Sequence, residues 1–348
     1  MVLILSVKHD HSTSSVMKWL NFMGEDVVRI NSDDDIYKLS HIDQQGIYFT
    51  HTITTKVINV LEAKACWWRR SGFSSKSMNP DTQFNPDIVD DDIRSFVSPK
   101  TPIKERETNS LIEFIYYKLY SNCFIKLGNP RYNLNRLIVM DIAAKHGFAV
   151  PPYRVITNNY QLAECKYEFN SCVSKAISDG IYNVVNNYRY QTYTELIEDF
   201  SIGVLEKKII YFPSLIAKTI TKQIEIRSFY INRVYYSMAI FSQSDPQTKV
   251  DFRKYNNTMP NRTEPFKLPL IIEEKLNKIF DDLDLNCGSV DLILDDKDEF
   301  VFLEINPVGQ YAMVSDPCNY NIDHIISKYL TSYPRGKSNF MVNEKEIN

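Results

Sequence analysis

The chain has 348 residues, 44% of them hydrophobic and 24% charged, and 40 Lys and Arg against 43 Asp and Glu give a formal net charge of -3. This length predicts two to three domains, each able to bury its own core. The balanced charge excludes the broad basic surface of a general nucleic-acid or membrane-surface binder. Only 10 glycines occur, none of them in a GxGxxG or GxxxxGK(S/T) sequence, which excludes the standard NAD-binding fingerprint and the P-loop.

The first part of the chain predicts a doubly wound α/β domain. Val2–Val7 is an apolar run typical of a central parallel strand, and Ser12–Ser15 offers N-caps to an amphipathic helix that ends at Gly24. With a second strand over 26–30, these elements make a β-α-β opening. The other expected elements are short strands within 46–60 and over 65–70, a mobile polar loop over 71–102, and a long helix over 105–125.

The second part alternates strands with helices. A helix is expected from Asn133 to Gly147, with Pro151-Pro152 as its stop signal. Further predicted elements are strands over 153–156, 171–177, 207–212, 224–231 and 234–241, a helix over 269–283, two adjacent strands over 289–294 and 300–305, and a last helix over 321–330. The apolar amino-terminal run is short and lacks a basic flank, and no apolar run is long enough to span a membrane. We therefore expect a cytoplasmic protein without a membrane or nucleic-acid partner.

The last two predicted strands carry the strongest chemical signal. Asp291 and Glu304 each interrupt an apolar strand, and Asn306 lies on the same face as Glu304 because strand side chains alternate. A hairpin would bring Asp291 beside them. Two carboxylates and an amide oxygen suit Mg²⁺, which prefers hard oxygen ligands together with phosphate oxygens. The alternative is that Asp291 caps a strand end and Glu304 is a solvated edge residue.

Basic residues within apolar strands form a second signal. Lys175 lies in such a strand, Glu225 and Arg227 share one face of another, and Arg253 follows in Asp-Phe-Arg. A buried lysine needs an anion, and an arginine fork donates two parallel hydrogen bonds to a phosphate or carboxylate. The alternatives are an ordinary edge-strand lysine and surface ion pairs of small energetic value.

Taken in order, these segments resemble the ATP-grasp ligases. The resemblance is most specific at Phe302–Gln310 together with Asp291, and it is greatest to ATP-grasp enzymes that mature ribosomal peptides, the microviridin-type and "grasp-with-spasm" (graspetide) ligases. Supporting segments span the chain: His11–Ser14, Trp67–Arg70, Asn133–Arg136, Pro151, Pro213–Leu215, Glu225–Arg227, Asp251–Arg253 and Asp316–Tyr320. The fold implied is α/β (α+β), an ATP-grasp fold with an N-terminal doubly wound pre-ATP-grasp domain.

The resemblance also implies roles for individual residues. ATP and Mg²⁺ are the expected cofactors, and adenine is expected to lie against a hinge of Ala217, Lys218, Thr219 and Ile220. Arg227 and Arg253 would be catalytic and meet the γ-phosphate and the acyl phosphate. The nucleotide-binding set would include Lys175, Arg136 and Glu225, and the metal ligands would be Asp291, Glu304 and Asn306.

This chain departs from the resembled family at the hinge. Many relatives carry Gln-Glu where it has Ala217-Lys218, and Lys222 stands where the branch that adds glutamate to a ribosomal protein has an acid. The implied domains are a pre-ATP-grasp domain over 1–128, a central lid subdomain over 129–213, a C-terminal subdomain with the Mg-ATP site over 214–335, and a polar tail over 336–348.

The reaction implied is the ATP-dependent cyclisation of a peptide. Asp or Glu carboxylates of a ribosomal precursor peptide would become acyl phosphates and then join Ser or Thr hydroxyls, or Lys amines, to give ω-esters or ω-amides. The partner would carry a leader and an acidic, Thr- and Ser-containing core. An intermolecular ligase that adds an amino acid to a peptide or protein, and a non-catalytic nucleotide-binding scaffold, stay open as alternatives, as does a homodimer.

Overall fold

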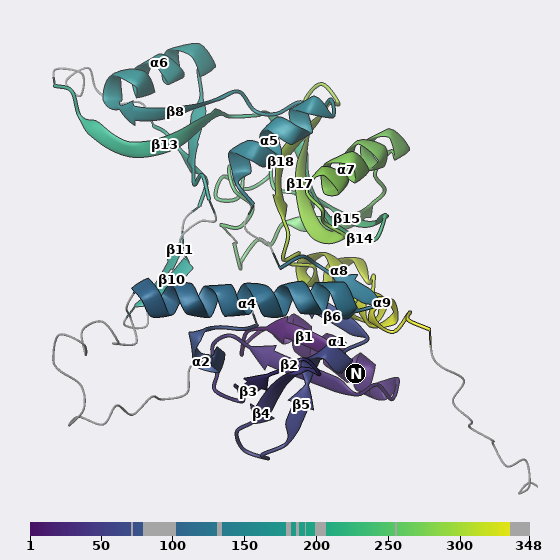
Figure 1. The fold of residues 1–348 in the computed structure, drawn as a ribbon. Coiled ribbons are helices and arrows are strands. Elements are labelled where there is room, and N and C mark those ends of the chain that lie inside the picture. Colours follow the sequence, from purple (N-terminus) through teal and green to yellow (C-terminus); the bar gives the residue numbers. More distant parts are fainter. Residues whose placement is uncertain are drawn as a thin grey trace, which may run out of the picture. The chain divides into compact units, whose positions relative to one another are not determined.

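The computed structural model of the protein describes residues 1–70, 72–78, 102–130, 134–178, 182–185, 188–191, 193–198, 207–254 and 256–334. Contacts group the chain into two compact units (Figure 1). Unit 1 contains Met1–Pro130 and the chain from Asp323 onward, and unit 2 contains Arg131–Ile322. The subdomain bounds expected from sequence, 1–128, 129–213, 214–335 and 336–348, stay a prediction.

Unit 1 is built on a parallel sheet in the order β2-β1-β6-β7. The β-α-β opening is as predicted, since α1 connects two neighbouring parallel strands. A three-stranded antiparallel sheet and a long helix complete the unit. Its elements are β1 (Val2–Ser6), α1 (His11–Phe22), β2 (Val27–Asn31), β3 (Tyr37–Ile42), β4 (Ile47–His51), β5 (Val57–Asn59), η1 (Val60–Glu62), β6 (Ala65–Trp68), α2 (Ser75–Met78), α4 (Pro102–Asn122), β7 (Ile125–Leu127) and α9 (Ile322–Leu330).

Apolar residues cover both faces of the parallel sheet. On one face Leu3 and Leu5 pack into a core with Ile115 and Leu119 of α4. α1 lies beside α9, where the Ser327 hydroxyl donates to the Val16 carbonyl at 3.2 Å. A sheet covered in this way explains why its strands are continuous apolar runs.

Two predictions for unit 1 need correction. The N-cap of α1 is Asp10, whose side chain accepts from the Thr13 amide at 3.3 Å, and not a residue of Ser12–Ser15. The strand β3 was not predicted. Of the loop predicted over 71–102, residues 72–78 include α2, and residues 71 and 79–101 lie outside the described residues.

The described part of unit 2 contains two larger antiparallel sheets and one separate two-stranded pair. The first has the order β12-β9-β13-β8, and α6 packs on one face of it (Figure 1). The strand predicted over 207–212 lies further along the chain, since β13 begins at Ile210 and continues through Pro213 to Lys218. The elements of this sheet are β8 (Tyr153–Asn158), α6 (Asn159–Phe169), β9 (Cys172–Lys175), β12 (Glu195–Leu196) and β13 (Ile210–Lys218), with β10 (Tyr182–Val185) and β11 (Tyr188–Gln191) pairing separately.

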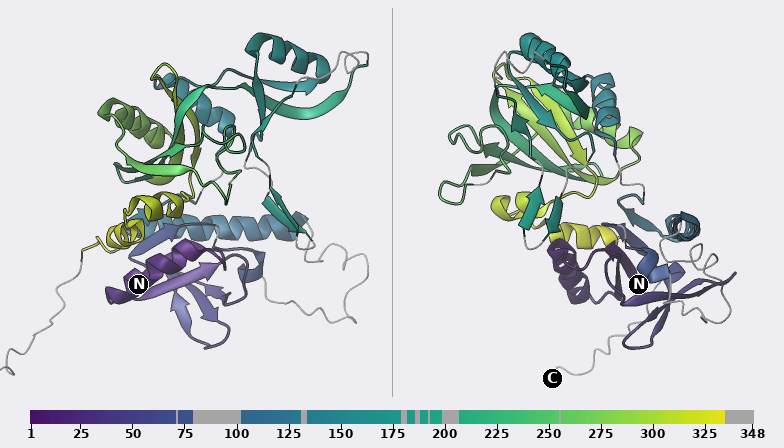
Figure 2. Two further views of the ribbon diagram at one scale, coloured as in Figure 1. Left: turned by 180° about the vertical axis from the view of Figure 1, so that it is seen from behind. Right: turned by 90° about the vertical axis from the view of Figure 1, so that its left-hand side faces the viewer.

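The second sheet has the order β16-β15-β14-β17-β18. α5 and α7 pack on the same face of it (Figures 1 and 2), where Phe302 and Ile305 join the core residues of both helices. The opposite face carries the charged residues. The elements are α5 (Arg136–Lys145), β14 (Lys222–Ile231), β15 (Val234–Phe241), β16 (Arg262–Phe266), α7 (Leu270–Asp282), β17 (Cys287–Asp295), β18 (Phe300–Asn306) and α8 (Ala312–Cys318).

Two β-bulges interrupt the register of this sheet. Lys222 pairs with Asp295 and Ile224 with Leu294, which leaves Gln223 as an extra residue in β14. Asp291 pairs with Glu304 and Leu292 with Phe302, which leaves Leu303 as an extra residue in β18. A bulge re-aims the side chains beside it. The bulge at Gln223 therefore brings Lys222 onto the same face of β14 as Glu225, which is three positions further along the chain.

Candidate active site

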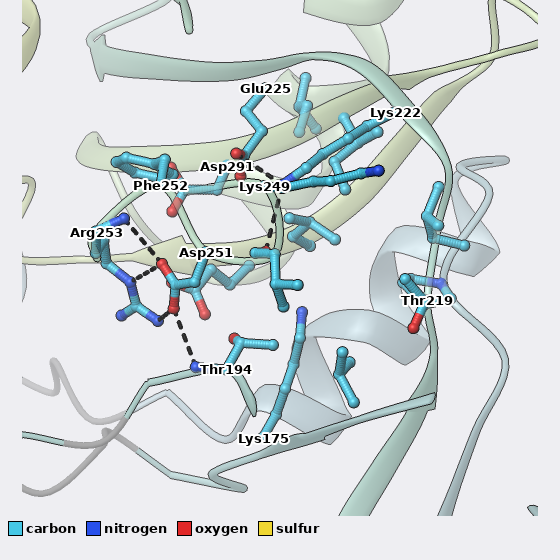
Figure 3. Close-up of a pocket in the computed structure, with 18 of the residues that line it drawn as sticks. Lys175, Thr194, Thr219, Lys222, Glu225, Lys249, Asp251, Phe252, Arg253 and Asp291 are labelled. Atoms are coloured by element: carbon cyan, nitrogen blue, oxygen red, sulfur yellow. Dashed lines mark hydrogen bonds and ion pairs between the residues drawn. The ribbon is translucent and has the colours of Figure 1, made fainter. Parts of the chain in front are cut away.

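A cavity of about 420 Å³ opens among residues of both sheets of unit 2. This volume is typical of small-molecule sites. Figure 3 shows its labelled side chains, which include Lys175 from β9, Asp291 from β17, and Asp251 and Arg253 from the connection between β15 and β16. The cavity therefore gathers charged residues from at least three separate segments of the chain.

A row of three charged residues crosses one wall of the cavity. Arg227 of β14 lies opposite Asp291 of β17, which lies opposite Glu304 of β18. The Arg227 Nη1 donates to Asp291 Oδ2 at 3.3 Å, and the Arg227 residue is 4% exposed. Arg136, at the start of α5, forms an ion pair with Glu304.

This row leaves hydrogen-bonding atoms unused. Asp291 Oδ1 and Arg227 Nε are buried and have no hydrogen-bond partner among the described residues. A buried charged atom without a partner is costly. The arrangement therefore fits a ligand that brings a cation to the Asp291 oxygen.

The electrostatics distinguish the two carboxylates. Burial, together with the Glu304 charge, raises the pKa of Asp291 to about 6, although Arg227 acts against this shift. Burial also opposes ionisation of Glu304, but the charges of Arg136 and Lys175 outweigh it and lower the pKa of Glu304. Burial lowers the pKa of Lys175 despite the charge of Glu304. The charges of these groups thus act on one another within one partly enclosed cavity.

The residues present fit a divalent cation. Two facing carboxylates, one of them with a buried free oxygen, provide hard ligands of the kind that Mg²⁺ uses with phosphate oxygens. No group of three His, Cys, Asp or Glu side chains that could hold a metal occurs within the described parts of the chain. A cation here would therefore need oxygen atoms from a ligand such as a phosphate.

The other end of the cavity is lined by the last residue of β13 and by the connection from β13 to β14. Lys218, Thr219 and Ile220 line it, and Thr219 is labelled in Figure 3. The Lys222 Nζ lies 2.7 Å from Glu225 Oε1, which also accepts from the Ser242 hydroxyl at 2.7 Å. Burial raises the pKa of Glu225, and the charge of Lys222 acts in the opposite direction.

Most of the residues singled out from sequence line this one cavity, with two exceptions. Ala217 is buried within β13 opposite Val173 and Tyr153, and Asn306 accepts a hydrogen bond from the Val308 amide at 3.1 Å. Neither is among the lining residues, which are Arg136, Lys175, Lys218, Thr219, Ile220, Glu225, Arg227, Arg253, Asp291 and Glu304 from the predicted set.

Sequence reasoning gave no role to several other lining residues. They are Tyr193, Thr194, Lys222, Gln243, Lys249 and Asp251. Asp251 lies in the Asp-Phe-Arg motif, and Lys222 was noted as a departure from the resembled family. The acid two residues before Arg253 was therefore a signal available in the sequence. The remaining four lie in segments without a distinctive pattern.

Comparison with solved structures shows the same fold along nearly the whole chain. The macrocyclase MdnC from Microcystis aeruginosa, bound with precursor peptide MdnA, has a TM-score of 0.69 and 20% identity, with 96% of this chain and 100% of that chain covered. A RiPP-associated ATP-grasp ligase from Chryseobacterium gregarium, in complex with ADP and a leader and core peptide, has a TM-score of 0.68 and 22% identity, with 94% of each chain covered.

A third structure is the ATP-grasp ligase PsnB complexed with minimal precursor, Mg and ADP, with a TM-score of 0.65 and 13% identity over 94% of this chain and 96% of that chain. No family model matches the sequence, and a search of curated proteins finds no match. Within the described residues no helix is long and apolar enough to cross a membrane. The two sheets of unit 2, the doubly wound sheet of unit 1 and these similarities together identify an ATP-grasp fold, as the sequence predicts.

Proposed function

We propose that the protein is an ATP-dependent ligase that activates a carboxylate as an acyl phosphate. The observation that carries this proposal is the row Arg227–Asp291–Glu304, which faces a cavity also lined by Lys175 and Arg253. The three cations Arg227, Lys175 and Arg253, placed around one cavity with two carboxylates, suit a reaction that brings several anions together. Phosphoryl transfer needs alignment and charge neutralisation more than covalent catalysis.

Each charged group has a distinct task in this proposal. Asp291 and Glu304 hold Mg²⁺, which neutralises phosphate charge when it is bound. Lys175 contacts the α- and β-phosphates as a point charge, whereas Arg227 and Arg253 present forks to the γ-phosphate and to the acyl phosphate. Lys218–Ile220 line the end where the nucleoside is expected. Asn306 remains a proposed ligand that would need to release the Val308 amide.

We further propose that the carboxylate belongs to a peptide. MdnC is a macrocyclase bound with a precursor peptide, and the ligase from C. gregarium is in complex with ADP and a leader and core peptide. By analogy, Asp or Glu side chains of a precursor would be joined to Ser or Thr hydroxyls or Lys amines of the same peptide. A leader segment bound away from the cavity would raise the effective concentration of the core at the acyl phosphate.

The test uses purified protein with ATP, Mg²⁺ and a Thr/Ser- and Asp/Glu-rich peptide encoded beside the gene. Product mass and ADP release are measured together. Ring formation predicts the loss of one water molecule for each bond and one ADP for each loss. Ligation of a free amino acid would instead add a residue, and nucleotide binding without ADP release would contradict an enzymatic role.

The same assay examines recognition in two parts. The core peptide is supplied alone, and then with the leader as a separate molecule. We expect the leader to accelerate modification of the core. Equal rates for the core alone and for the full precursor would contradict a leader-dependent enzyme and would favour a ligase of small substrates.

A further inference from the structure

The connection between β15 and β16 is folded on itself by hydrogen bonds among its own residues, and one further bond ties it to β14. The Thr248 hydroxyl donates to the Ser242 carbonyl at 3.1 Å, and the side-chain amide of Asn256 donates to Asp245 Oδ2 at 2.8 Å. The Lys222 Nζ, from β14, donates to the Val250 carbonyl at 3.3 Å. The backbone directly before Asp251 is thus tied to β14, the strand that carries Arg227.

Asp251 is 4% exposed, and its carboxylate accepts four hydrogen bonds. Oδ1 accepts from the Arg253 amide at 3.0 Å and from Arg253 Nε at 2.9 Å. Oδ2 accepts from Arg253 Nη2 at 2.6 Å and from the Thr194 amide at 3.0 Å. Figure 3 shows these bonds meeting at the one carboxylate. Charge-assisted bonds of this kind are strong and fix the guanidinium in one plane.

The Thr194 amide lies next to the other sheet. It directly precedes β12, and β12 pairs with β9 so that Glu195 lies opposite Ser174, the neighbour of Lys175. A second contact crosses at the same place, where Lys254 Nζ lies 2.7 Å from Glu195 Oε2. The Asp251 carboxylate is therefore shared between the strand pair that carries Lys175 and the side chain of Arg253.

We propose that Asp251 is a positioning residue that couples the placement of the β9–β12 strand pair to the orientation of the Arg253 guanidinium. This inference rests on the proposed function, in which Arg253 meets the reacting phosphate. If the β9–β12 pair moves away from the second sheet, Oδ2 loses the Thr194 amide and the carboxylate can turn. The Arg253 guanidinium then turns with it, because two of the three remaining bonds to the carboxylate come from that group.

Asp251→Asn is the first variant to measure, because an amide keeps the shape but cannot accept all four bonds. A displacement of about 1 Å at an aligned group can cost about a hundredfold in rate. We expect kcat for ADP release to fall by about that factor, while KM for ATP stays within about threefold. The matched control is Asp295→Asn, a buried acid at the turn between β17 and β18 whose side chain accepts from the Lys297 and Glu299 amides and from no residue of this connection, and it should keep kcat close to wild type.

A double variant separates positioning from an independent role. If Asp251 acts through Arg253, Asp251→Asn combined with Arg253→Lys should be no slower than Arg253→Lys alone, within about threefold. Effects that multiply would overturn the inference. So would a loss of thermal stability in Asp251→Asn with an unchanged kcat.

Amide hydrogen exchange supplies a measurement that needs neither turnover nor a folded Asp251 variant. Coupling is reciprocal, so Arg253→Lys should speed exchange of the Thr194 amide in the complex with Mg²⁺ and ADP. Unchanged exchange would overturn the inference. If wild-type protein forms no product with any peptide, the proposed function fails. The exchange result still decides whether Asp251 links the β9–β12 strand pair to Arg253.

Discussion

Each unit buries an aspartate beside arginine, and the two groups differ in how fully their charges are satisfied. In unit 1, Asp10 Oδ2 accepts from Arg69 Nε at 3.0 Å and from Arg70 Nε at 3.3 Å, while Oδ1 accepts from the Thr13 amide. In unit 2, Asp291 has one bond from Arg227, and its Oδ1 has no partner among the described residues.

The pKa values move in opposite directions as a result. Burial opposes ionisation of Asp10, but the charges of Arg69 and Arg70 and the Thr13 amide hold its pKa below the ordinary value. Burial and a second carboxylate raise the pKa of Asp291 to about 6. An aspartate beside arginine thus serves a structural role where both of its oxygens are bonded, and indicates a binding role where one is left free.

The largest effect is expected from Glu304→Gln. Removing this charge leaves Arg136 and Lys175 without their carboxylate and weakens the cation site beside Asp291. We expect product formation to fall by about a thousandfold or more with the fold intact. Glu299→Gln, at the exposed turn between β17 and β18, is the control. Normal turnover by Glu304→Gln at saturating Mg²⁺ would refute the metal assignment.

Asp10→Ala should have the second largest effect, and on stability instead of activity. The variant loses the N-cap of α1 and leaves Arg69, 3% exposed, without its carboxylate. Breaking a buried pair in this way costs about 3 kcal/mol or more of unfolding free energy. Chemical denaturation measures it, with the exposed Asp26→Ala as control. A large loss of kcat in the folded variant would show that Asp10 does more than stabilise the fold, and would contradict the contrast with Asp291.

Arg227→Lys should slow catalysis by about a hundredfold, because lysine keeps the charge but lacks the fork that suits an acyl phosphate. Nucleotide affinity should change only a few-fold. Single-turnover rates and nucleotide binding are measured in parallel, with the exposed Arg233→Lys as control. If affinity and rate fell in equal proportion, Arg227 would be a ground-state nucleotide contact.

The smallest effect is a pH dependence in unit 1. Because the pKa of Asp10 is lower in the folded state, its contribution to stability is complete above the unfolded pKa and is lost as pH falls through the folded pKa. The difference in unfolding free energy between wild type and Asp10→Asn should therefore shrink from about pH 5 to about pH 3. A difference that grows on acidification would contradict the direction of the shift.

Sequence reasoning succeeded where the signal was local. An acid within an apolar strand is visible without knowledge of the fold. Asp291 and Glu304 were singled out in this way, and both line the cavity. The cap of α1 was misplaced because Asp10 and the serines after it are chemically equivalent N-caps. A proline within a helix hid α8, which contains Pro317.

Contacts between distant segments could not be predicted. Thr194 and Asp251 are 57 positions apart, and Asp10 and Arg69 are 59 apart. Neither backbone amides nor ion pairs leave a trace in the spacing of a single sequence. The cavity could therefore be anticipated from its charged strands, whereas the bonds that hold those charges in place required the structure.

The two bulges of the second sheet change the phase of its strands. In a regular strand, Phe302 and Glu304 would point to the same face, yet Phe302 is in the core and Glu304 lines the cavity, because Leu303 is an extra residue between them. Gln223 has the same effect before Glu225. In a saturation scan across either strand, the positions that tolerate polar residues should alternate with those that require apolar ones. This alternation should shift by one residue at the bulge, so that odd-numbered positions behave on one side of it as even-numbered positions do on the other.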